Sequence, residues 1–421
     1  MAQTDKKPVL LLAEMCNPAW ASVPLVGWQH VAHLAQVTSV HLVTHVVNQE
    51  DIEARKPSFP VTYITYDWAD RLFTSISRRL FGSDYSKASL TLLKIPFYIW
   101  FEWRVWWRLR GEFKRNQFSL IHRLTPVSPA VPSMIAWLTR NRNLPFVLGP
   151  INGGLPWPKG YESAARDREW ISRFRHYYHV LPFISSMRKR AELILVGSHF
   201  TKDEIPRKFH AKCRYFPENA VDENLLLNAE RKDVTSTLKV VFVGRLVALK
   251  GPDIVLRASL PYLRQKSMHL EFVGDGPLMS ELRDIVAKEN LQDQVRFHGW
   301  IAQQSQVQKM MQDFHVLAFP SVREFGGGVV VEAMAKGVVP IVLDYGGPGE
   351  IVTAESGIKL ALLDQEQTIQ SLNRAIGEVL NDRERLKTMS AQAIERVRKF
   401  YTWQSKAQMI LQFYQELEFR G

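Results

Sequence analysis

The sequence predicts an α/β protein built from two doubly wound domains, each with a parallel sheet covered by helices. Its 421 residues exceed what one hydrophobic core usually supports, so we expect two domains. Short apolar runs alternate with helical patterns along both halves, which is typical of parallel sheets with helices on both faces. Hydrophobic residues make up 46% and charged residues 23% of the chain, as in ordinary globular proteins.

Residues 1–218 are predicted to form the first domain. The apolar run over residues 9–13 could belong to a signal peptide or to a buried strand. We expect the strand, because Glu14 ends the run early and no cleavage-site pattern follows. A loop with Pro24 and Gly27 precedes a helix predicted over residues 28–36. Further strands are predicted over residues 41–47, 61–66, 120–122, 145–148 and 193–196.

The second domain, residues 219–399, is predicted to repeat this construction. Ligands of such sheets bind at the carboxyl ends of the strands, so two domains facing each other would define a cleft. Residues 390–419 are predicted to be helical, with apolar side chains near the end. Strands are predicted over residues 239–243, 269–273, 295–297, 316–319 and 340–343, each followed by a loop with glycine.

The excess positive charge lies in the first half of the chain. Residues 1–218 hold 30 Lys and Arg against 17 Asp and Glu, whereas residues 219–421 hold 24 against 25. Ten of the twelve tryptophans also lie in the first half. Such a surface indicates an anionic membrane or a nucleic acid as partner. We favour the membrane, and exclude nucleic acid, because no nucleic-acid recognition motif accompanies the charge.

The densest basic and aromatic segment, residues 94–115, is predicted to form a helix that lies on the membrane surface. Trp100, Trp103 and Trp107 share a helical face, and Arg104 and Arg108 would reach lipid phosphates. Charges within the segment make it too polar to span a bilayer. The alternative is a core helix whose aromatic side chains pack under a neighbouring element.

The cysteine content indicates the compartment. Cys16 and Cys213 are the only cysteines, which suits a reducing cytoplasm. We therefore expect a cytoplasmic protein, bound peripherally to the inner face of the membrane.

The segment from residue 316 to residue 343 gives the strongest indication of a ligand site. A strand over residues 316–319, a glycine loop and a helix over residues 329–336 would present the free amides of the helix start to an anion. Glu324 and Glu332 flank the loop, and carboxylates there would bind hydroxyls. A sugar nucleotide carries both an anionic diphosphate for the amides and hydroxyls for the carboxylates. The alternative is an ordinary strand, turn and helix with two surface acids. The loop and helix start consist of Gly326, Gly327, Gly328 and Val329.

Two cations follow another predicted strand end. Gly244 ends the strand over residues 239–243, and Arg245 and Lys250 come after it. Arg offers a planar fork and Lys a mobile point charge, so the pair suits a diphosphate leaving group. Alone, basic residues in loops are more often solvated.

Taken in order, these motifs resemble a known family. The chain reads GRLVALKG from Gly244, FVGDGP from Phe272 and VRFHGW from Val295, then has the segment with Glu324 and Glu332, and continues with GGPGEIV. This order is similar to that of the retaining nucleotide-sugar glycosyltransferases of family 4 (glycosyl transferases group 1), most of all over residues 193–355. The resemblance implies the GT-B fold, with two Rossmann-like domains facing across a cleft. It also implies a C-terminal helix, about residues 400–421, that packs back on the first domain.

The resemblance implies roles for the donor-side residues. Arg245 and Lys250 would hold the donor diphosphate, helped by the amides of residues 327–329. Glu324 would contact hydroxyls of the transferred sugar, and Glu332 the ribose. The donor would be a UDP-sugar or a GDP-sugar. No metal or other cofactor is expected, because similar enzymes commonly need no metal and because the chain has no Asp-X-Asp pair.

The first domain departs from the family pattern in two places. The family usually has two glycines in the loop after the first strand, where the helix start approaches the donor phosphate or the acceptor, whereas here Gly27 takes this place and is followed by Trp28. The family often has a His after the strand at residues 145–148, whereas here the loop contains Asn152 and Gly153. We expect His122, in a catalytic or acceptor-binding role, or Asn152, in a binding turn, to replace it. A lone His at a strand end is more often structural.

The sequence therefore predicts a retaining, metal-independent glycosyltransferase that acts at the cytoplasmic membrane face. It would move a sugar from a nucleoside-diphosphate sugar to a lipid-linked or glycan acceptor, in polysaccharide or glycolipid biosynthesis. The alternative is a catalytically silent protein of the same fold that binds a sugar nucleotide or glycan as a partner. The presence of the whole donor set favours the enzyme.

Overall fold

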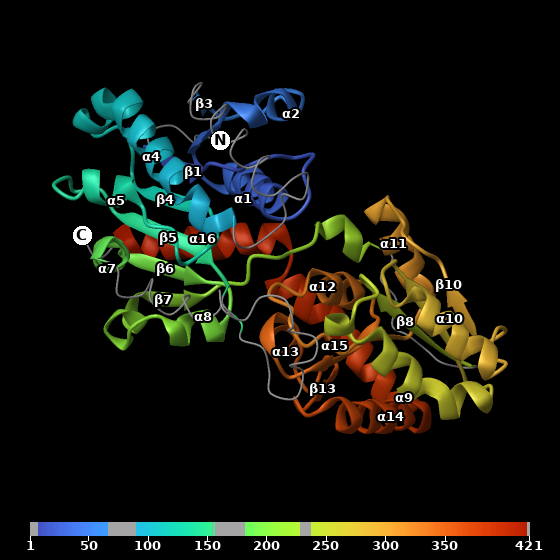
Figure 1. The fold of residues 1–421 in the computed structure, drawn as a ribbon. Coiled ribbons are helices and arrows are strands. Elements are labelled where there is room, and N and C mark those ends of the chain that lie inside the picture. The colour runs from blue at the N-terminus through green and yellow to red at the C-terminus, as the bar shows by residue number, and fades with distance from the viewer. Residues whose placement is uncertain (1–6, 66–89, 154, 156–181, 228–236, 419–421) are drawn as a thin grey trace. The chain divides into compact units, whose positions relative to one another are not determined.

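The computed structural model describes residues 7–65, 90–153, 155, 182–227 and 237–418 (Figure 1). These residues form two compact units. Unit 1 contains the described residues up to 153, residues 182–218 and residues 406–418. Unit 2 contains Leu155 and the described residues between 219 and 405.

Unit 1 is built on a parallel sheet of seven strands in the order β3-β2-β1-β4-β5-β6-β7. Six of these strands lie where the sequence predicts them, with ends shifted by a few residues. The short strand β7 was not predicted. The strands are β1 (Val9–Ala13), β2 (Val40–His45), β3 (Val61–Ile64), β4 (Ile121–Thr125), β5 (Phe146–Ile151), β6 (Leu193–Val196) and β7 (Cys213–Tyr215).

Helices cover both faces of this sheet. Leu10 and Leu12 of β1 join one core and Leu11 joins another, as expected when alternate side chains of a strand point to opposite faces. The first core is closed by α4 (Leu90–Lys114), α5 (Met134–Leu138) and α7 (Pro182–Arg190). The second is closed by α1 (Val23–Val37) and α16 (Trp403–Glu418). The short helices α2 (Gln49–Glu53) and α8 (His199–Glu204) complete the helices described in this unit.

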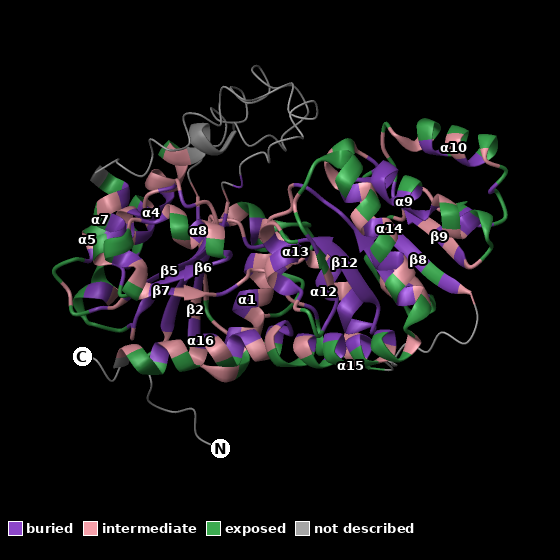
Figure 2. Ribbon diagram, turned by 90° about the horizontal axis from the view of Figure 1, so that it is seen from below, coloured by how far each residue is buried: buried purple, intermediate pink, exposed green. Residues whose placement is uncertain are grey.

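Unit 2 is built on a parallel sheet of six strands in the order β10-β9-β8-β11-β12-β13. Its central strands β11 and β12 are wholly buried, as the purple ribbon of β12 in Figure 2 shows, because helices lie on both faces, whereas the edge strands β10 and β13 each contain an exposed residue. The strands are β8 (Leu238–Val243), β9 (Met268–Val273), β10 (Val295–Phe297), β11 (Val316–Phe319), β12 (Val339–Leu343) and β13 (Ile358–Leu360). The helices are α9 (Pro252–Arg264), α10 (Met279–Lys288), α11 (Gln304–Met310), α12 (Gly328–Ala335), α13 (Gly346–Ile351), α14 (Gln365–Asn381) and α15 (Arg383–Phe400).

The C-terminal segment differs from the prediction of one helix over residues 390–419. It forms two helices, α15 and α16, which are separated at Tyr401 and Thr402. Backbone bonds hold the chain extended at this break: the Val221 amide donates to Tyr401 O (2.9 Å), and the Trp403 amide donates to Val221 O (3.1 Å). The break therefore depends on a partner far away in the sequence.

Among the helices that the structure describes, none combines the length and apolar character needed to cross a bilayer.

Candidate functional site

Two neighbouring strand ends in unit 2 bring Lys250 to Glu324. A 3₁₀ turn, Ala248–Lys250, follows β8, and Leu249 O of this turn accepts hydrogen bonds from the Val322 amide (3.0 Å) and from Ser321 Oγ (3.3 Å) after β11. As a result Lys250 Nζ forms an ion pair and hydrogen bond with Glu324 Oε2. The Lys250 and Glu324 side chains are 15% and 23% exposed. The pair is therefore within reach of a ligand at the surface.

Arg245 lies on the loop that connects β8 to this turn. The loop is fixed at the carboxyl end of the sheet, because the Gly244 amide donates to Val273 O (2.9 Å) and the Leu246 amide donates to Asp275 O (2.9 Å). The Arg245 side chain is exposed. Arg245 and Lys250 thus stand on one short segment beyond one strand end, as the sequence predicts.

Gly327 shapes the start of α12. It has φ of 62° and ψ of 33°, and a Cβ atom there would lie 2.9 Å from Ile351 Cδ1. Only glycine suits such a left-handed, crowded position. The helix begins at Gly328, one residue earlier than predicted. Because the first amides of a helix lack intrahelical acceptors, those of Gly328 and Val329 are suited to an anion.

Glu332 lies in α12 and is held by the neighbouring helix α11. Gln304 Nε2 donates to Glu332 Oε1, and Gln308 Nε2 donates to the same oxygen at 3.4 Å. Burial raises the pKa of Glu332, and the two amide donors act against this shift. The sequence prediction did not include these glutamines, because nothing in the spacing of α11 shows which way its side chains face.

The start of α13, which follows β12, supports the same site. The Gly347 amide donates to Glu324 O at 3.0 Å and so fixes the backbone of Glu324. Gly347 belongs to the GGPGEIV motif, to which the sequence prediction assigned no role. The glycines of this motif were the feature of the sequence from which a role at the site could have been predicted.

The loop after β10 stands beside the end of β9. The His298 amide donates to Phe272 O (2.9 Å), and Gly299 O accepts from the Gly274 amide (2.8 Å). His298 Nε2 lies 2.5 Å from Glu271 Oε2. Trp300, at the tip, is 72% exposed. This loop therefore presents a large apolar side chain at the same edge of the sheet.

In unit 1, His122 has the surroundings of a structural residue. It is fully buried in β4, with Nε2 at 2.6 Å from Gly149 O and Nδ1 at 2.5 Å from the Tyr414 hydroxyl of α16. Burial lowers its pKa to about 4, so the ring is neutral at pH 7. With both nitrogens engaged inside the unit, His122 does not fit the predicted catalytic role.

Asn152 and Gly153 are also engaged within unit 1. Asn152 Nδ2 donates to both carboxylate oxygens of Glu218 (3.0 and 2.9 Å), and its Oδ1 accepts from Ser198 Oγ (2.9 Å) and Thr201 Oγ1 (3.1 Å). The Gly153 amide donates to Asn152 Oδ1 at 3.0 Å. The polar groups of the predicted binding turn therefore form hydrogen bonds within unit 1, which connect β5, α8 and Glu218.

Gly27 does not start a helix, contrary to the prediction. Helix α1 begins at Val23, and Pro24 occupies its first turn, where proline is favoured. Gly27 lies in the next turn, and a Cβ atom there would be 2.9 Å from Met15 O. Its role is to let α1 pack closely on the loop after β1.

The tryptophans of α4 divide between the core and the surface. Phe101, Val105 and Leu109 are buried, so one side of the helix is a core face. Trp100 is half-buried against this core, whereas Trp103 and Trp107 are 37% and 46% exposed. Trp100 also stacks on Trp103, with ring centroids 4.9 Å apart, so the predicted row of indoles is partly covered at Trp100 and exposed at Trp103 and Trp107. Arg104 is half-buried and Arg108 is exposed.

Comparison with known proteins bears on unit 2 first. Residues 228–396 match the family described as Glycosyl transferases group 1. The chain is 29% identical over 168 residues to the phosphatidylinositol N-acetylglucosaminyltransferase gpi3 subunit of Schizosaccharomyces pombe, a match that covers 39% of this chain and 35% of that protein. It is 30% identical over 193 residues to D-inositol 3-phosphate glycosyltransferase of Nocardia farcinica, a match that covers 43% and 42%. The chain thus spans less than half the length of these relatives.

A solved structure matches along the whole chain. The crystal structure of Anabaena Alr3699/HepE in complex with UDP has a TM-score of 0.60 and 16% sequence identity, and the match covers 97% of this chain and 100% of that one. At this identity the likeness concerns the fold.

Proposed function

We propose that the protein is a glycosyltransferase with a nucleoside-diphosphate sugar as donor, because residues 228–396 match the family Glycosyl transferases group 1 and the chain has the GT-B fold. The acceptor would be a lipid-linked compound or a glycan at the cytoplasmic face of a membrane. The meeting of Lys250 with Glu324 is the observation that carries the proposal. A cation and a hydroxyl acceptor stand side by side at a strand end, as a sugar diphosphate requires.

Lys250 can change partners when a donor binds. The diphosphate of a donor carries more negative charge than the single carboxylate of Glu324, so it can replace Glu324 as the partner of Lys250. The Glu324 carboxylate is then free to accept hydrogen bonds from sugar hydroxyls. Arg245 and the first amides of α12 add positive charge for the same diphosphate.

These groups also suit the departure of the diphosphate. The bond between the anomeric carbon and the phosphate oxygen breaks, and the acceptor oxygen forms the new bond to that carbon. Lys250 and Arg245 stabilise the negative charge that develops on the leaving oxygen. In other transferases a metal ion has this role. We therefore propose metal-independent transfer.

Retention of configuration is the second part of the mechanism. With His122 buried and engaged, the departing phosphate itself can take the proton of the acceptor hydroxyl, on the face from which it leaves. Attack on that face preserves the anomeric configuration. Assignment to family 4 follows from the same residues and remains part of the proposal.

Glu332 would bind the ribose hydroxyls of the nucleotide. Its carboxylate is already oriented by Gln304 and Gln308, so little side-chain freedom is lost when the ribose binds. Trp300, exposed on the loop after β10 at the same edge of the sheet, would offer a flat apolar surface to the base of the nucleotide.

Release of nucleoside diphosphate tests the proposal. Purified protein is incubated with UDP- and GDP-sugars and with membrane lipid extract as acceptor source, with and without EDTA. We expect release with one donor, unchanged by EDTA, and a fall of about 100-fold in Glu324→Gln and Lys250→Ala. The anomeric configuration of the product, read by NMR, tests retention.

The competing function is a catalytically silent binder of sugar nucleotides. It predicts that a nucleoside diphosphate binds while no donor is turned over under any acceptor condition. That outcome would contradict the enzyme proposal and leave the donor site intact.

A further inference from the structure

We propose that the outer side of helices α4, α5 and α7 is a docking surface for an anionic lipid bilayer. This surface, called the aromatic–basic surface below, extends well beyond the predicted tryptophans of α4. It consists of Trp103, Trp107 and Arg110 of α4, Trp137 of α5 with Arg140 of the turn that follows, and Phe183 of α7.

The three helices lie on one face of the unit 1 sheet. Val105 of α4, Ile135 of α5 and Ile184 of α7 are buried in the same core, and α5 contacts both of the other helices. Figure 1 shows them side by side over β4, β5 and β6. Their outer sides therefore form one continuous face.

Large apolar side chains are exposed on this face. Trp103 is 37%, Trp107 46%, Trp137 49% and Phe183 74% exposed. Within α4 the exposed indoles lie opposite the buried Val105 and Leu109, so the helix is apolar on two sides. Clustered exposure of this kind marks an interaction site, because leaving such side chains in water has a free-energy cost.

Positive charge accompanies the aromatic rings. The guanidinium groups of Arg110 and Arg140 lie 5.1 Å and 4.7 Å from the ring centroids of Trp107 and Trp137. The carboxylates of the three helices do not offset this charge at the surface, since Glu102 is buried and Glu112 half-buried.

Indoles beside guanidinium groups match the headgroup layer of a bilayer. Tryptophan favours that depth, and each cation near an anionic leaflet contributes about 1 kcal/mol of attraction. Charge complementarity thus identifies anionic lipid as the occupant.

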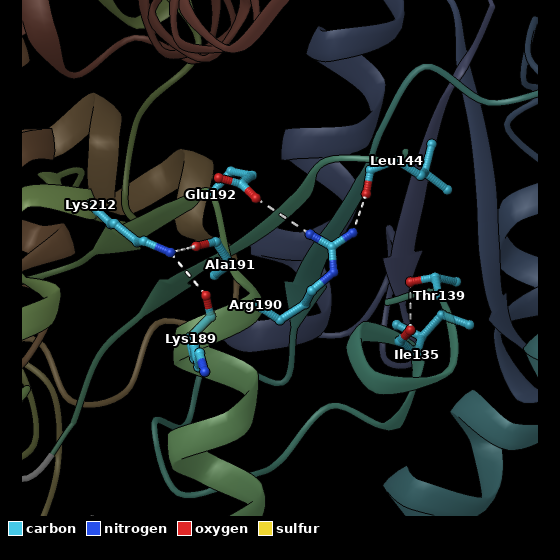
Figure 3. A network of polar contacts seen from close by, with 8 residues as sticks. All are labelled: Ile135, Thr139, Leu144, Lys189, Arg190, Ala191, Glu192 and Lys212. Carbon is cyan, nitrogen blue, oxygen red and sulfur yellow. Dashed lines mark hydrogen bonds and ion pairs between the residues drawn. The ribbon is translucent and has the colours of Figure 1, made fainter. Parts of the chain in front are cut away.

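The frame beneath the surface is held by hydrogen bonds (Figure 3). Lys212 Nζ donates to Lys189 O (2.9 Å) and Ala191 O (2.7 Å) and so caps the end of α7. The Arg190 guanidinium donates to Leu144 O (2.7 Å), just before β5. Thr139 Oγ1 donates to Ile135 O (2.7 Å) at the end of α5. Because the helix ends are fixed, docking orders few further groups.

This inference deepens the proposed function, on which its purpose rests: a docked enzyme would meet lipid-linked acceptors in the plane of the membrane. The binding step itself needs no donor and no turnover. Failure of vesicle binding and failure of transfer are therefore separate results.

Sedimentation of the full chain with vesicles tests the proposal. The probes are vesicles of phosphatidylcholine alone and vesicles of phosphatidylcholine mixed with phosphatidylglycerol. We expect the wild type to sediment with the anionic vesicles, and added salt to weaken this binding. Two double variants, Trp107→Ala with Trp137→Ala and Arg110→Ser with Arg140→Ser, are expected to bind at least about tenfold more weakly.

Trp300→Ala is the matched control, because this indole is 72% exposed but belongs to unit 2. It is expected to bind vesicles as the wild type does. Melting curves and donor hydrolysis in solution show whether the double variants remain folded and active. Equal binding to neutral and anionic vesicles, or wild-type binding by either double variant, would overturn the proposal. So would a dimer in solution that the tryptophan double variant abolishes.

Discussion

At the scale of single residues, the carboxylates of the candidate site differ in how they are held. Glu324 forms an ion pair with Lys250, for which a phosphate can compete. Glu332 accepts hydrogen bonds from the uncharged side-chain amides of Gln304 and Gln308. The first is suited to exchange partners during binding. The second is suited to stay in place.

Gln304 therefore provides a test of how Glu332 is positioned. In Gln304→Ala the carboxylate loses its main donor, so we expect the nucleoside diphosphate to bind about tenfold more weakly. Calorimetric titration measures this affinity. Gln306→Ala on the same helix is the control, because its side chain is exposed, and it should bind as the wild type does. Equal affinity in both variants would show that Gln304 does not position Glu332.

His122 yields a prediction for the pH dependence of stability. Burial lowers its pKa from 6.5 to about 4, so between these values the unfolded chain binds a proton that the folded chain does not. The contribution of the neutral His122 ring to the free energy of unfolding is complete above pH 6.5. It is lost as the pH falls towards 4, and the loss amounts to about 3 kcal/mol.

The variant His122→Gln removes this titration. Urea unfolding at pH 7 and at pH 4.5 should show the wild type more stable than the variant at pH 7, with a much smaller difference at pH 4.5. His33→Gln, at a half-buried position of α1, is the control. A difference that stays constant with pH would mean that His122 is not held neutral.

His122 also shows what sequence spacing does not reveal. A His at a strand end is compatible with a catalytic and with a structural role until its partner is known, and Tyr414 lies 292 positions away. Glu324 and Lys250 were predicted because each follows a recognisable strand end, and strand ends of one parallel sheet meet at one edge. Local patterns identify such residues, whereas partners brought by packing remain hidden.

At the scale of elements, α4 and α5 are joined by a buried carboxylate. Glu102 of α4 accepts from Ser133 Oγ (2.9 Å) and from the Ile135 amide (2.9 Å), at the start of α5. Burial raises the pKa of Glu102, and the charge of the buried Arg123 acts against this shift. Glu102 thus takes the capping role that Ser133 does not fill from its own side chain.

Removing this carboxylate should loosen the frame of the aromatic–basic surface. Glu102→Ala removes the acceptor of the Ser133 hydroxyl and the Ile135 amide, and it removes the negative charge that acts on the buried Arg123, so we expect a loss of about 3 kcal/mol in the free energy of unfolding. Urea unfolding measures it. Glu112→Ala, half-buried on the same helix, should change stability by about 0.5 kcal/mol or less. Similar losses in both variants would contradict a joining role for Glu102.

The elements show the same division between local and distant information. Most strands of both sheets were predicted because runs of apolar and β-branched residues mark them, whereas the short edge strands β7 and β13 were not predicted. The start of α1 was missed, since Pro24 in a first helical turn resembles a loop residue. The break between α15 and α16 was missed because Val221, its partner, lies in another part of the chain.

At the scale of the whole molecule, charge and site chemistry are divided between the halves of the chain. The excess of Lys and Arg falls in residues 1–218, where the aromatic–basic surface lies, whereas Arg245, Lys250, Glu324 and Glu332 all belong to unit 2. Membrane docking and donor binding can therefore be altered separately by mutation.

The central claim is that unit 2 binds a nucleoside diphosphate through Lys250. The melting temperature of the full chain, measured with UDP, GDP and ADP, tests it most directly, because a ligand that binds only the folded state must raise it. We predict that one diphosphate raises the melting temperature of the wild type and of Lys239→Ala, an exposed lysine on β8, but raises that of Lys250→Ala much less. A melting temperature that no diphosphate changes, or an equal rise in Lys250→Ala, would contradict the claim.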